Sequence, residues 1–159
     1  MKRRLLLAAG LALCASLVLA QSIPKPGPKD LCPVCGMLVS KYPNWVAVVA
    51  WKDGHAHFFD GAKDLFKFLH ELPKFAPGHR REDIAGIYVT DFYNLERIDA
   101  RQAWFVTGSD VLGPMGHELV PLATRADAED FRKEHKAKRV LAFGQVTPEI
   151  VAGLDAGKF

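Results

Sequence analysis

Apolar residues fall along the first half of the chain in two patterns, and each pattern predicts a different element. Residues 45–51 are an unbroken run of aliphatic and tryptophan side chains, which predicts a buried strand. The turn-forming Lys52-Asp53-Gly54 follows, so a second strand is expected over 55–59 in a hairpin with the first. Apolar residues then recur at helical spacing, which predicts a helix over 61–72 with Asp60 as its N-cap.

The second half repeats this strand–strand–helix order. Thr124 to Asp127 forms a capping box that opens a helix to about residue 136, and Thr147-Pro148 begins a short terminal helix. Because several strand pairs are hairpin-like, the pattern favours the α+β class over a doubly wound parallel sheet. The expected strands of this half cover residues 84–92, 102–107, 119–122 and 139–143.

The N-terminus is typical of a secretory signal peptide. Lys2-Arg3-Arg4 precedes an apolar run over 5–19, and Val18-Leu19-Ala20 fits a signal-peptidase site before Gln21. The run is too short to span a bilayer comfortably. We therefore expect residues 1–20 to be removed and the mature protein to be periplasmic.

Cys14 lies inside that apolar run, and Leu13 stands where a lipoprotein signal has a small residue. We expect Cys14 to be discarded with the signal rather than lipidated. Residues 21–31, rich in proline, form an expected tether. The remaining residues, 32–159, form one domain with halves of about 32–80 and 81–159.

Net charge does not suggest a nucleic-acid partner, and we expect none. Three of the 21 lysine and arginine residues belong to the signal, and the rest balance the 18 acidic residues. The mature chain is then formally neutral and has no basic patch interleaved with aromatic residues.

The segment Cys32-Pro33-Val34-Cys35-Gly36-Met37 carries the strongest chemical signal. A Cys-x-x-Cys pair followed by glycine can turn both thiolates toward one ion. In an oxidising compartment the same pair can form a disulfide. A four-cysteine zinc site is excluded, because no second pair exists, whereas a two-cysteine, two-histidine site stays open. Met37 favours Cu(I), which accepts thioether ligands.

Gly113-Pro114-Met115-Gly116-His117 is a second candidate metal-binding loop. Its glycines and proline predict a tight loop that presents Met115 and His117 outward. The residues alone are better explained by an ordinary turn whose methionine packs on the core.

Two other functions compete with copper binding. A thiol-disulfide oxidoreductase would use Cys32 and Cys35, but such a pair begins a helix, and here Pro43 interrupts any helix that follows. A structural knuckle in which zinc holds the N-terminus is the other alternative.

Several segments, in this order, resemble the NosL family of nitrous oxide reductase accessory proteins. They are residues 32–37, 52–54, 58–60, 88–92, 98–100, 103–109, 113–116 and 127–131. The resemblance implies a fold of two small ββαβ-type units related to organomercurial lyase. It also implies a periplasmic Cu(I)-binding metallochaperone, not an enzyme, that delivers copper for assembly of nitrous oxide reductase or a related copper enzyme.

The resemblance further implies which residues bind the metal. The matching ligands are Cys32, Cys35, Met37 and Met115, with His117 as the first choice of histidine and His57 as the second. The implied partners are a copper-receiving enzyme or copper transport and assembly proteins. A homodimer around a shared ion stays open. Members of the family are typically lipoproteins, and the signal around Cys14 departs from that pattern.

Overall fold

The computed structural model describes residues 22–159. The predicted signal peptide, its cleavage site before Gln21 and Cys14 lie outside the described residues. Within residues 22–159, no helix has the length and apolar character needed to cross a membrane.

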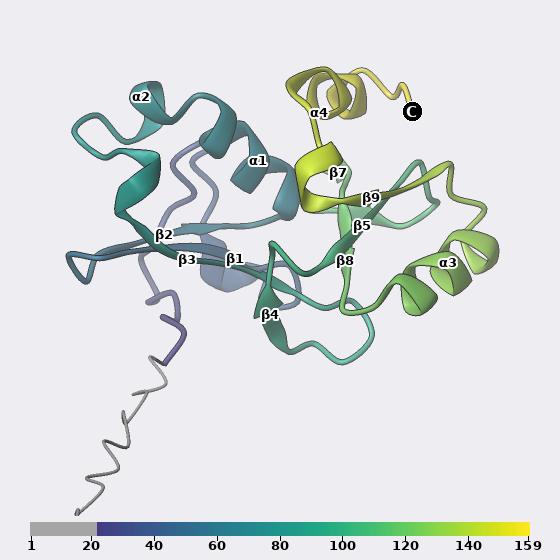
Figure 1. The fold of residues 1–159 in the computed structure, drawn as a ribbon, viewed down its shortest axis with the longest axis horizontal. Coiled ribbons are helices and arrows are strands. Elements are labelled where there is room, and N and C mark those ends of the chain that lie inside the picture. The colour runs from purple at the N-terminus through teal and green to yellow at the C-terminus, as the bar shows by residue number, and fades with distance from the viewer. Residues whose placement is uncertain (1–21) are drawn as a thin grey trace, which may run out of the picture.

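The first unit is a four-stranded antiparallel sheet with two helices on one face (Figure 1). Strand β1 (Ala47–Trp51) is paired on one side with β2 (Ala56–Phe59) and on the other with β3 (Ile84–Thr90), and β4 (Arg97–Asp99) pairs with β3. The predicted turn between β1 and β2 is present, with Gly54 at a φ of 90°. The helices are α1 (Ala62–His70) and α2 (Leu72–Phe75).

The second unit has the same topology as the core of the first. Strand β5 (Trp104–Thr107) is central, between β8 (Val120–Leu122) and β9 (Arg139–Ala142), and α3 (Arg125–Glu134) connects β8 to β9. In both units the order is strand, strand, helix, strand, with the first strand in the middle. The expected α+β fold of two ββαβ-type units is therefore confirmed.

The remaining elements are short. A hairpin of β6 (Leu112–Gly113) and β7 (Gly116–His117) is inserted between β5 and β8, and α4 (Pro148–Asp155) follows β9. The 3-10 helices are η1 (Val39–Lys41), η2 (Arg81–Asp83) and η3 (Phe143–Gln145). The predicted N-cap is present, because Thr124 Oγ1 accepts a hydrogen bond of 3.1 Å from the Asp127 backbone N–H, while the Asp127 carboxylate accepts from the Thr124 hydroxyl instead of completing a capping box.

The change from one sheet to the other comes later than the expected division near residue 80. Strands β3 and β4 belong to the first sheet, which ends at Asp99, and the second sheet starts at Trp104. The expected second half, about 81–159, thus begins inside the first sheet, because β3 returns to pair with β1 after the helices.

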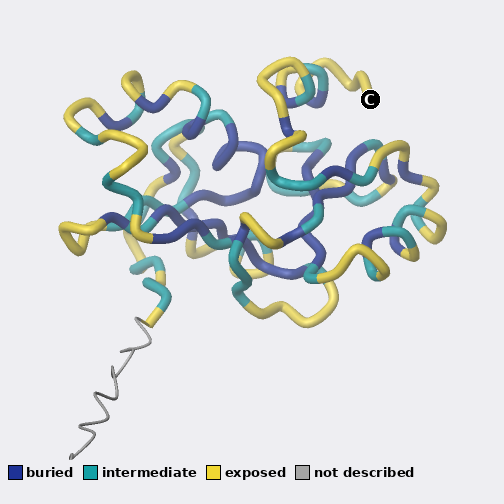
Figure 2. Tube along the Cα trace, in the orientation of Figure 1, coloured by how far each residue is buried: buried dark blue, intermediate teal, exposed yellow. Residues whose placement is uncertain are grey.

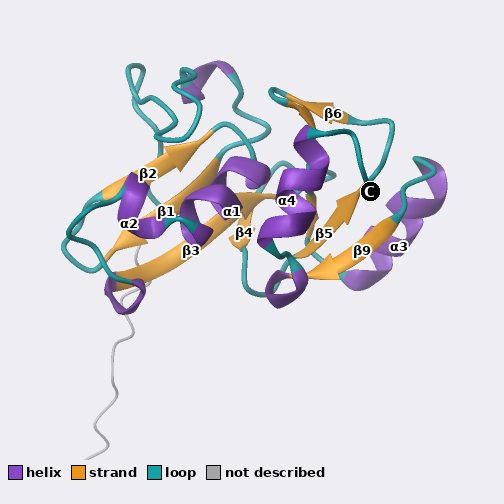
Figure 3. Cartoon of the chain, turned by 90° about the horizontal axis from the view of Figure 1, so that it is seen from above, coloured by secondary structure: helices purple, strands orange, loops and turns teal. Residues whose placement is uncertain are grey.

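One apolar core joins the two units. Phe66 of α1 packs edge-on against Phe105 of β5, with ring centroids 5.0 Å apart, and its ring also lies 5.0 Å from that of Phe143. Figure 2 shows buried chain running through both sheets. Seen from above, α1 and α4 lie side by side over the junction (Figure 3). Lys67 of α1 forms an ion pair of 2.8 Å with Asp155 of α4.

Candidate metal centre

The cysteine segment folds as a compact knuckle at the N-terminal edge of the core. The Gly36 N–H donates to the Cys32 carbonyl at 2.9 Å, and the Cys32 N–H donates to the Met37 carbonyl at 2.8 Å. Gly36 has a φ of 76°, a left-handed conformation that favours glycine, as the sequence predicted. Both cysteines are free thiols, Cys32 buried with 1% of its surface exposed and Cys35 half-buried.

Two buried aspartates face the thiols from the start of α1. The Cys32 thiol donates to Asp64 Oδ2 at 3.4 Å, and the Cys35 thiol donates to Asp60 Oδ1 at 3.2 Å. One ligand atom from each of these four residues lies within 4.8 Å of all the others. In the part of the chain that the structure describes, this is the one group of Cys, His, Asp and Glu so arranged.

Asp60 is not the helix cap that the sequence predicted. The N-cap of α1 is Gly61, and no side chain caps this helix. Gly61 is extended and lies against Glu118, whose carboxylate a Cβ at position 61 would meet. The Asp60 side chain instead turns inward to the Cys35 thiol.

The geometry explains how sequence reasoning missed both aspartates as candidate ligands. Asp60 and Asp64 are four residues apart around the start of one helix, a spacing that puts two side chains on one face. That spacing, next to the apolar Phe58-Phe59, was the available signal. Nothing in the local sequence connects it with a cysteine segment 25 residues earlier.

The thiols of the metal-free protein hold their protons. Burial raises the pKa of Cys32 to about 12, and the nearby Asp64 and Asp60 add to the rise. Burial and the same two carboxylates also raise the pKa of Cys35. A cation at this point would offset the cost of two thiolates beside two carboxylates, so metal binding here is coupled to proton release.

The carboxylates also have unused acceptor capacity. Asp60 Oδ2 and Asp64 Oδ1 are buried without a hydrogen-bond donor, although the Lys67 ammonium lies 3.5 Å from Asp64 Oδ1. Buried acceptors without donors are costly. These two carboxylates and the two thiols together make a set of ligands that suits a metal cation.

These features disfavour the thiol-disulfide oxidoreductase alternative. Reactive cysteines have a lowered pKa, commonly at a helix N-terminus. Here the pair lies in a turn, the pKa of both thiols is raised, and the start of the helix carries the carboxylates instead.

The four donors also revise the argument against zinc. From the sequence, a four-cysteine zinc site was excluded and a two-cysteine, two-histidine site stayed open. Thiolates and carboxylates are both zinc ligands, and the structure supplies two of each. The number of possible ligands therefore no longer distinguishes zinc from copper. The choice of metal depends instead on the predicted thioether ligands and on the similarity to known proteins.

Neither methionine is placed in the cysteine–aspartate cluster by a recorded contact. Met37 is half-buried at the end of the knuckle, where its carbonyl accepts the Cys32 N–H. Met115 lies at the tip of the β6–β7 hairpin with 42% of its surface exposed, so it does not pack on the core as an ordinary turn methionine would. Its carbonyl accepts from the Lys63 ammonium of α1 at 2.8 Å. Met37 and Met115 stay predicted ligands.

The two candidate histidines point to other neighbours. His117 packs edge-on against Phe159, with ring centroids 4.7 Å apart, and its Nδ1 is buried without a described partner. His57 Nδ1 accepts from the Trp51 indole N–H at 2.8 Å. Neither histidine belongs to the group of four, so their roles also stay predictions.

Buried Glu118 fixes the β6–β7 hairpin against α1. Its Oε1 accepts the backbone N–H of Lys63 at 2.6 Å and that of Leu119 at 2.8 Å. Burial raises the pKa of Glu118 from 4.5 to about 8, more than these donors and the Lys63 charge lower it. The native protein therefore keeps a proton on Glu118 that the unfolded chain loses above about pH 4.5.

We expect this proton to make stability fall with rising pH. The contribution of protonated Glu118 to the free energy of unfolding is fully present below about pH 4.5 and is lost as the pH rises through about 8. Glu118→Gln keeps the shape and an acceptor without the titration. Urea unfolding at pH 5, 6, 7 and 8 should show a shallower decline for Glu118→Gln than for the wild type. Parallel declines would show that Glu118 is ionised in the native state.

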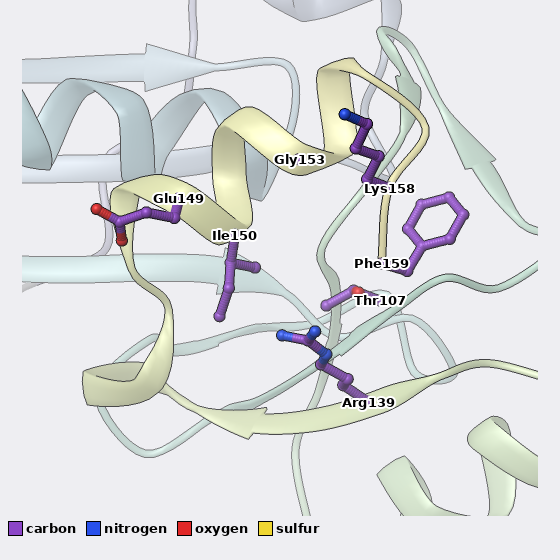
Figure 4. Close-up of a pocket in the computed structure, with 7 residues that line it drawn as sticks. All are labelled: Thr107, Arg139, Glu149, Ile150, Gly153, Lys158 and Phe159. Atoms are coloured by element: carbon purple, nitrogen blue, oxygen red, sulfur yellow. The ribbon is translucent and has the colours of Figure 1, made fainter.

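Several surface hollows are separate from the cysteine–aspartate cluster. One of about 290 Å³ lies between α4 and β9 (Figure 4). In it the guanidinium of Arg139 points toward Ile150, while Glu149 and Lys158 extend away from each other. None of the predicted metal ligands lines this pocket, and its charged groups do not converge on one point.

Comparisons with known proteins identify relatives of this chain by sequence and by fold. The chain is 30% identical over 125 residues to the copper-binding lipoprotein NosL of Stutzerimonas stutzeri, an alignment that covers 74% of this chain and 62% of that relative. The fold matches the crystal structure of the copper chaperone NosL from Shewanella denitrificans with a TM-score of 0.67 and 26% identity, covering 80% of this chain and 97% of that one. The sequence model of the family described as NosL matches residues 24–151. With its two ββαβ units and its cysteine–aspartate cluster, the chain belongs to the NosL family.

Proposed function

We propose that this protein is a periplasmic metallochaperone that binds Cu(I) through Cys32 and Cys35 and delivers it to nitrous oxide reductase or a related copper enzyme. The observation that carries the proposal is the convergence of two free thiols and two carboxylates at one point. The printed names of two relatives, a copper-binding lipoprotein and a copper chaperone, support copper as the metal. Those names describe binding rather than catalysis, and we propose that this chain is likewise not an enzyme.

The different burial of the two cysteines suggests how copper is transferred. Cys32 is held inside the core, whereas Cys35 is half-buried at its edge. A ligand from a partner protein can therefore approach the ion on the Cys35 side and displace that thiolate first. Cys32 then holds the ion until the partner supplies a second ligand, so the ion is never free in solution.

In this proposal the aspartates assist copper binding electrostatically. Cu(I) is a soft ion that prefers thiolate and thioether over carboxylate oxygen. Asp60 and Asp64 hold the thiols in place through hydrogen bonds before the metal arrives, and their negative charge attracts a cation. Met37 and the exposed Met115 supply the thioether ligands that distinguish copper from zinc.

An anaerobic titration of the reduced protein with Cu(I) and with Zn(II), each against a chromogenic chelator, tests this assignment. We expect one equivalent of Cu(I) to bind, with an affinity that Met37→Ala or Met115→Ala lowers by about tenfold. Zn(II) affinity should be unchanged in both variants, because zinc does not use thioether ligands. Leu112→Ala, another exposed side chain on the same hairpin as Met115, is the matched control. Equal loss of Zn(II) and Cu(I) affinity would contradict the thioether role.

Delivery needs a separate test in cells that make nitrous oxide reductase. We expect deletion of the gene to lower the copper content of the purified reductase, and wild-type protein but not Cys35→Ser to restore it. Normal copper loading after deletion would refute delivery to this enzyme and leave the metal-binding result intact.

A further inference from the structure

We propose that His55, His79 and Asp53 form a second metal site that binds a divalent ion such as Zn²⁺ or Cu²⁺ and shares no residue with the cysteine–aspartate cluster. We call these three residues the hairpin-tip site, because Asp53 and His55 lie at the turn between β1 and β2.

Two imidazoles lie close to a single carboxylate oxygen there, although the three ligand atoms are not yet all within 4.8 Å of one another. His55 Nδ1 lies 3.1 Å from Asp53 Oδ2, and His79 Nε2 lies 3.3 Å from the same atom. His79 comes from the loop that joins α2 to η2, so the site brings together two segments more than twenty residues apart. Two nitrogens and one oxygen from separate side chains are a ligand set that zinc sites use, with water in the remaining position. Imidazole also suits Cu²⁺.

Two of the three side chains are already held in position. The His79 ring packs on Trp51, with centroids 4.2 Å apart, and presents Nε2 toward Asp53. Asp53 is fixed through its other oxygen, because Oδ1 accepts the His55 backbone N–H at 3.0 Å. These two residues therefore lose little conformational entropy when an ion binds to them.

His55 closes the site by moving. Its side chain is 79% exposed, against 28% for His79, so its ring can turn about the Cα–Cβ bond without disturbing the core. An ion at Asp53 Oδ2 would replace the hydrogen bond from His79 and the close approach of His55 to that atom. This is a site with one mobile and two fixed ligands.

The surroundings leave room for water on the ion. A hollow of about 360 Å³ is lined by Asp53 and His79 and also by Asp83, which adds negative charge. Lys52 lines the same hollow, but its ammonium donates to the Glu82 carbonyl at 2.6 Å and is held there. His57 is not a member, because Trp51 donates to its Nδ1.

The hairpin-tip site and the cysteine–aspartate cluster differ in the ions that suit them. Thiolates select soft Cu(I), whereas two imidazoles and a carboxylate select borderline divalent ions. The proposal therefore extends beyond the proposed chaperone function, and a negative result for one site leaves the other site unaffected.

The test is a Zn²⁺ titration of the Cys32→Ser/Cys35→Ser protein, which removes the thiolates, followed by long-range ¹H–¹⁵N spectra of the histidine rings. We expect the His55 and His79 ring signals to shift together and to reach their end point at one equivalent. Added Cu²⁺ should quench the fluorescence of Trp51, which touches His79. Ring signals of His55 and His79 that do not move at several equivalents would overturn the proposal.

Variants then separate the site from general histidine binding. His55→Gln and His79→Gln should each lower Zn²⁺ affinity by about tenfold or more, since losing a ligand costs at least as much as losing an outer-shell partner. His135→Gln is the matched control, because His135 also pairs with a single carboxylate, Asp110, at 2.8 Å but has no second imidazole there. If His79→Gln fails to fold, the Zn²⁺ affinity of His55→Gln, a change at an exposed side chain, is sufficient to test the site. Unchanged affinity in His55→Gln, or an equal loss in His135→Gln, would refute the site.

Discussion

Replacing both Cys32 and Cys35 by serine is expected to lower the affinity for Cu(I) by more than about a hundredfold. Losing an outer-shell partner of a metal site commonly costs 10–100-fold, and here both soft ligands are removed. Serine can still donate a hydrogen bond to Asp60 or Asp64, so the carboxylates keep their partners. An anaerobic competition titration against a Cu(I) chelator measures the change.

The single variants distinguish the two cysteines. Cys32→Ser should also lower the free energy of unfolding, because Cys32 is buried in the core and its sulfur fills space that an oxygen does not. Cys35→Ser, at the edge, should lower copper affinity with a smaller effect on stability. Full Cu(I) affinity in the folded double variant would contradict the assignment and move the copper ligands away from the knuckle.

Most of the fold could be predicted because its main elements are long and strongly patterned. The run over 45–51 contains β1, and the predicted N-cap at Thr124 opens α3. Strand β4 and the β6–β7 hairpin were missed, because two or three residues show no periodicity. Their pairing depends on the neighbouring chain, which a local pattern does not contain.

The site could be predicted only in part, for a similar reason. Cys32 and Cys35 lie three residues apart, so their spacing alone indicates a shared ion. Asp60 and Asp64 join them only when α1 packs on the knuckle, and that contact is set by the core. An acidic residue before a helix has a common local explanation, capping, and that explanation was wrong for Asp60.

The metal centre is expected to depend on the second unit for its stability, although the two cysteines and two aspartates of the cluster lie in the first. Phe105 of β5 is fully buried, packs against Phe66 of α1, and belongs to the same core cluster as Cys32. Phe105→Ala should lower the free energy of unfolding by about 3–5 kcal/mol, through lost burial and the cavity left behind. Denaturant unfolding should remain a single transition.

Phe131→Ala is the matched control, since Phe131 is equally buried but packs in the separate cluster between α3 and the second sheet. If the units are one cooperative body, thiol reactivity of Cys32 and loss of helical circular dichroism should coincide in both variants. Thiols that stay protected in Phe131→Ala while part of the helical signal is lost would show that the units unfold separately. In that case the first unit would hold the cysteines and aspartates of the copper site without the second unit, and the contact between Phe66 and Phe105 would contribute less than its burial indicates.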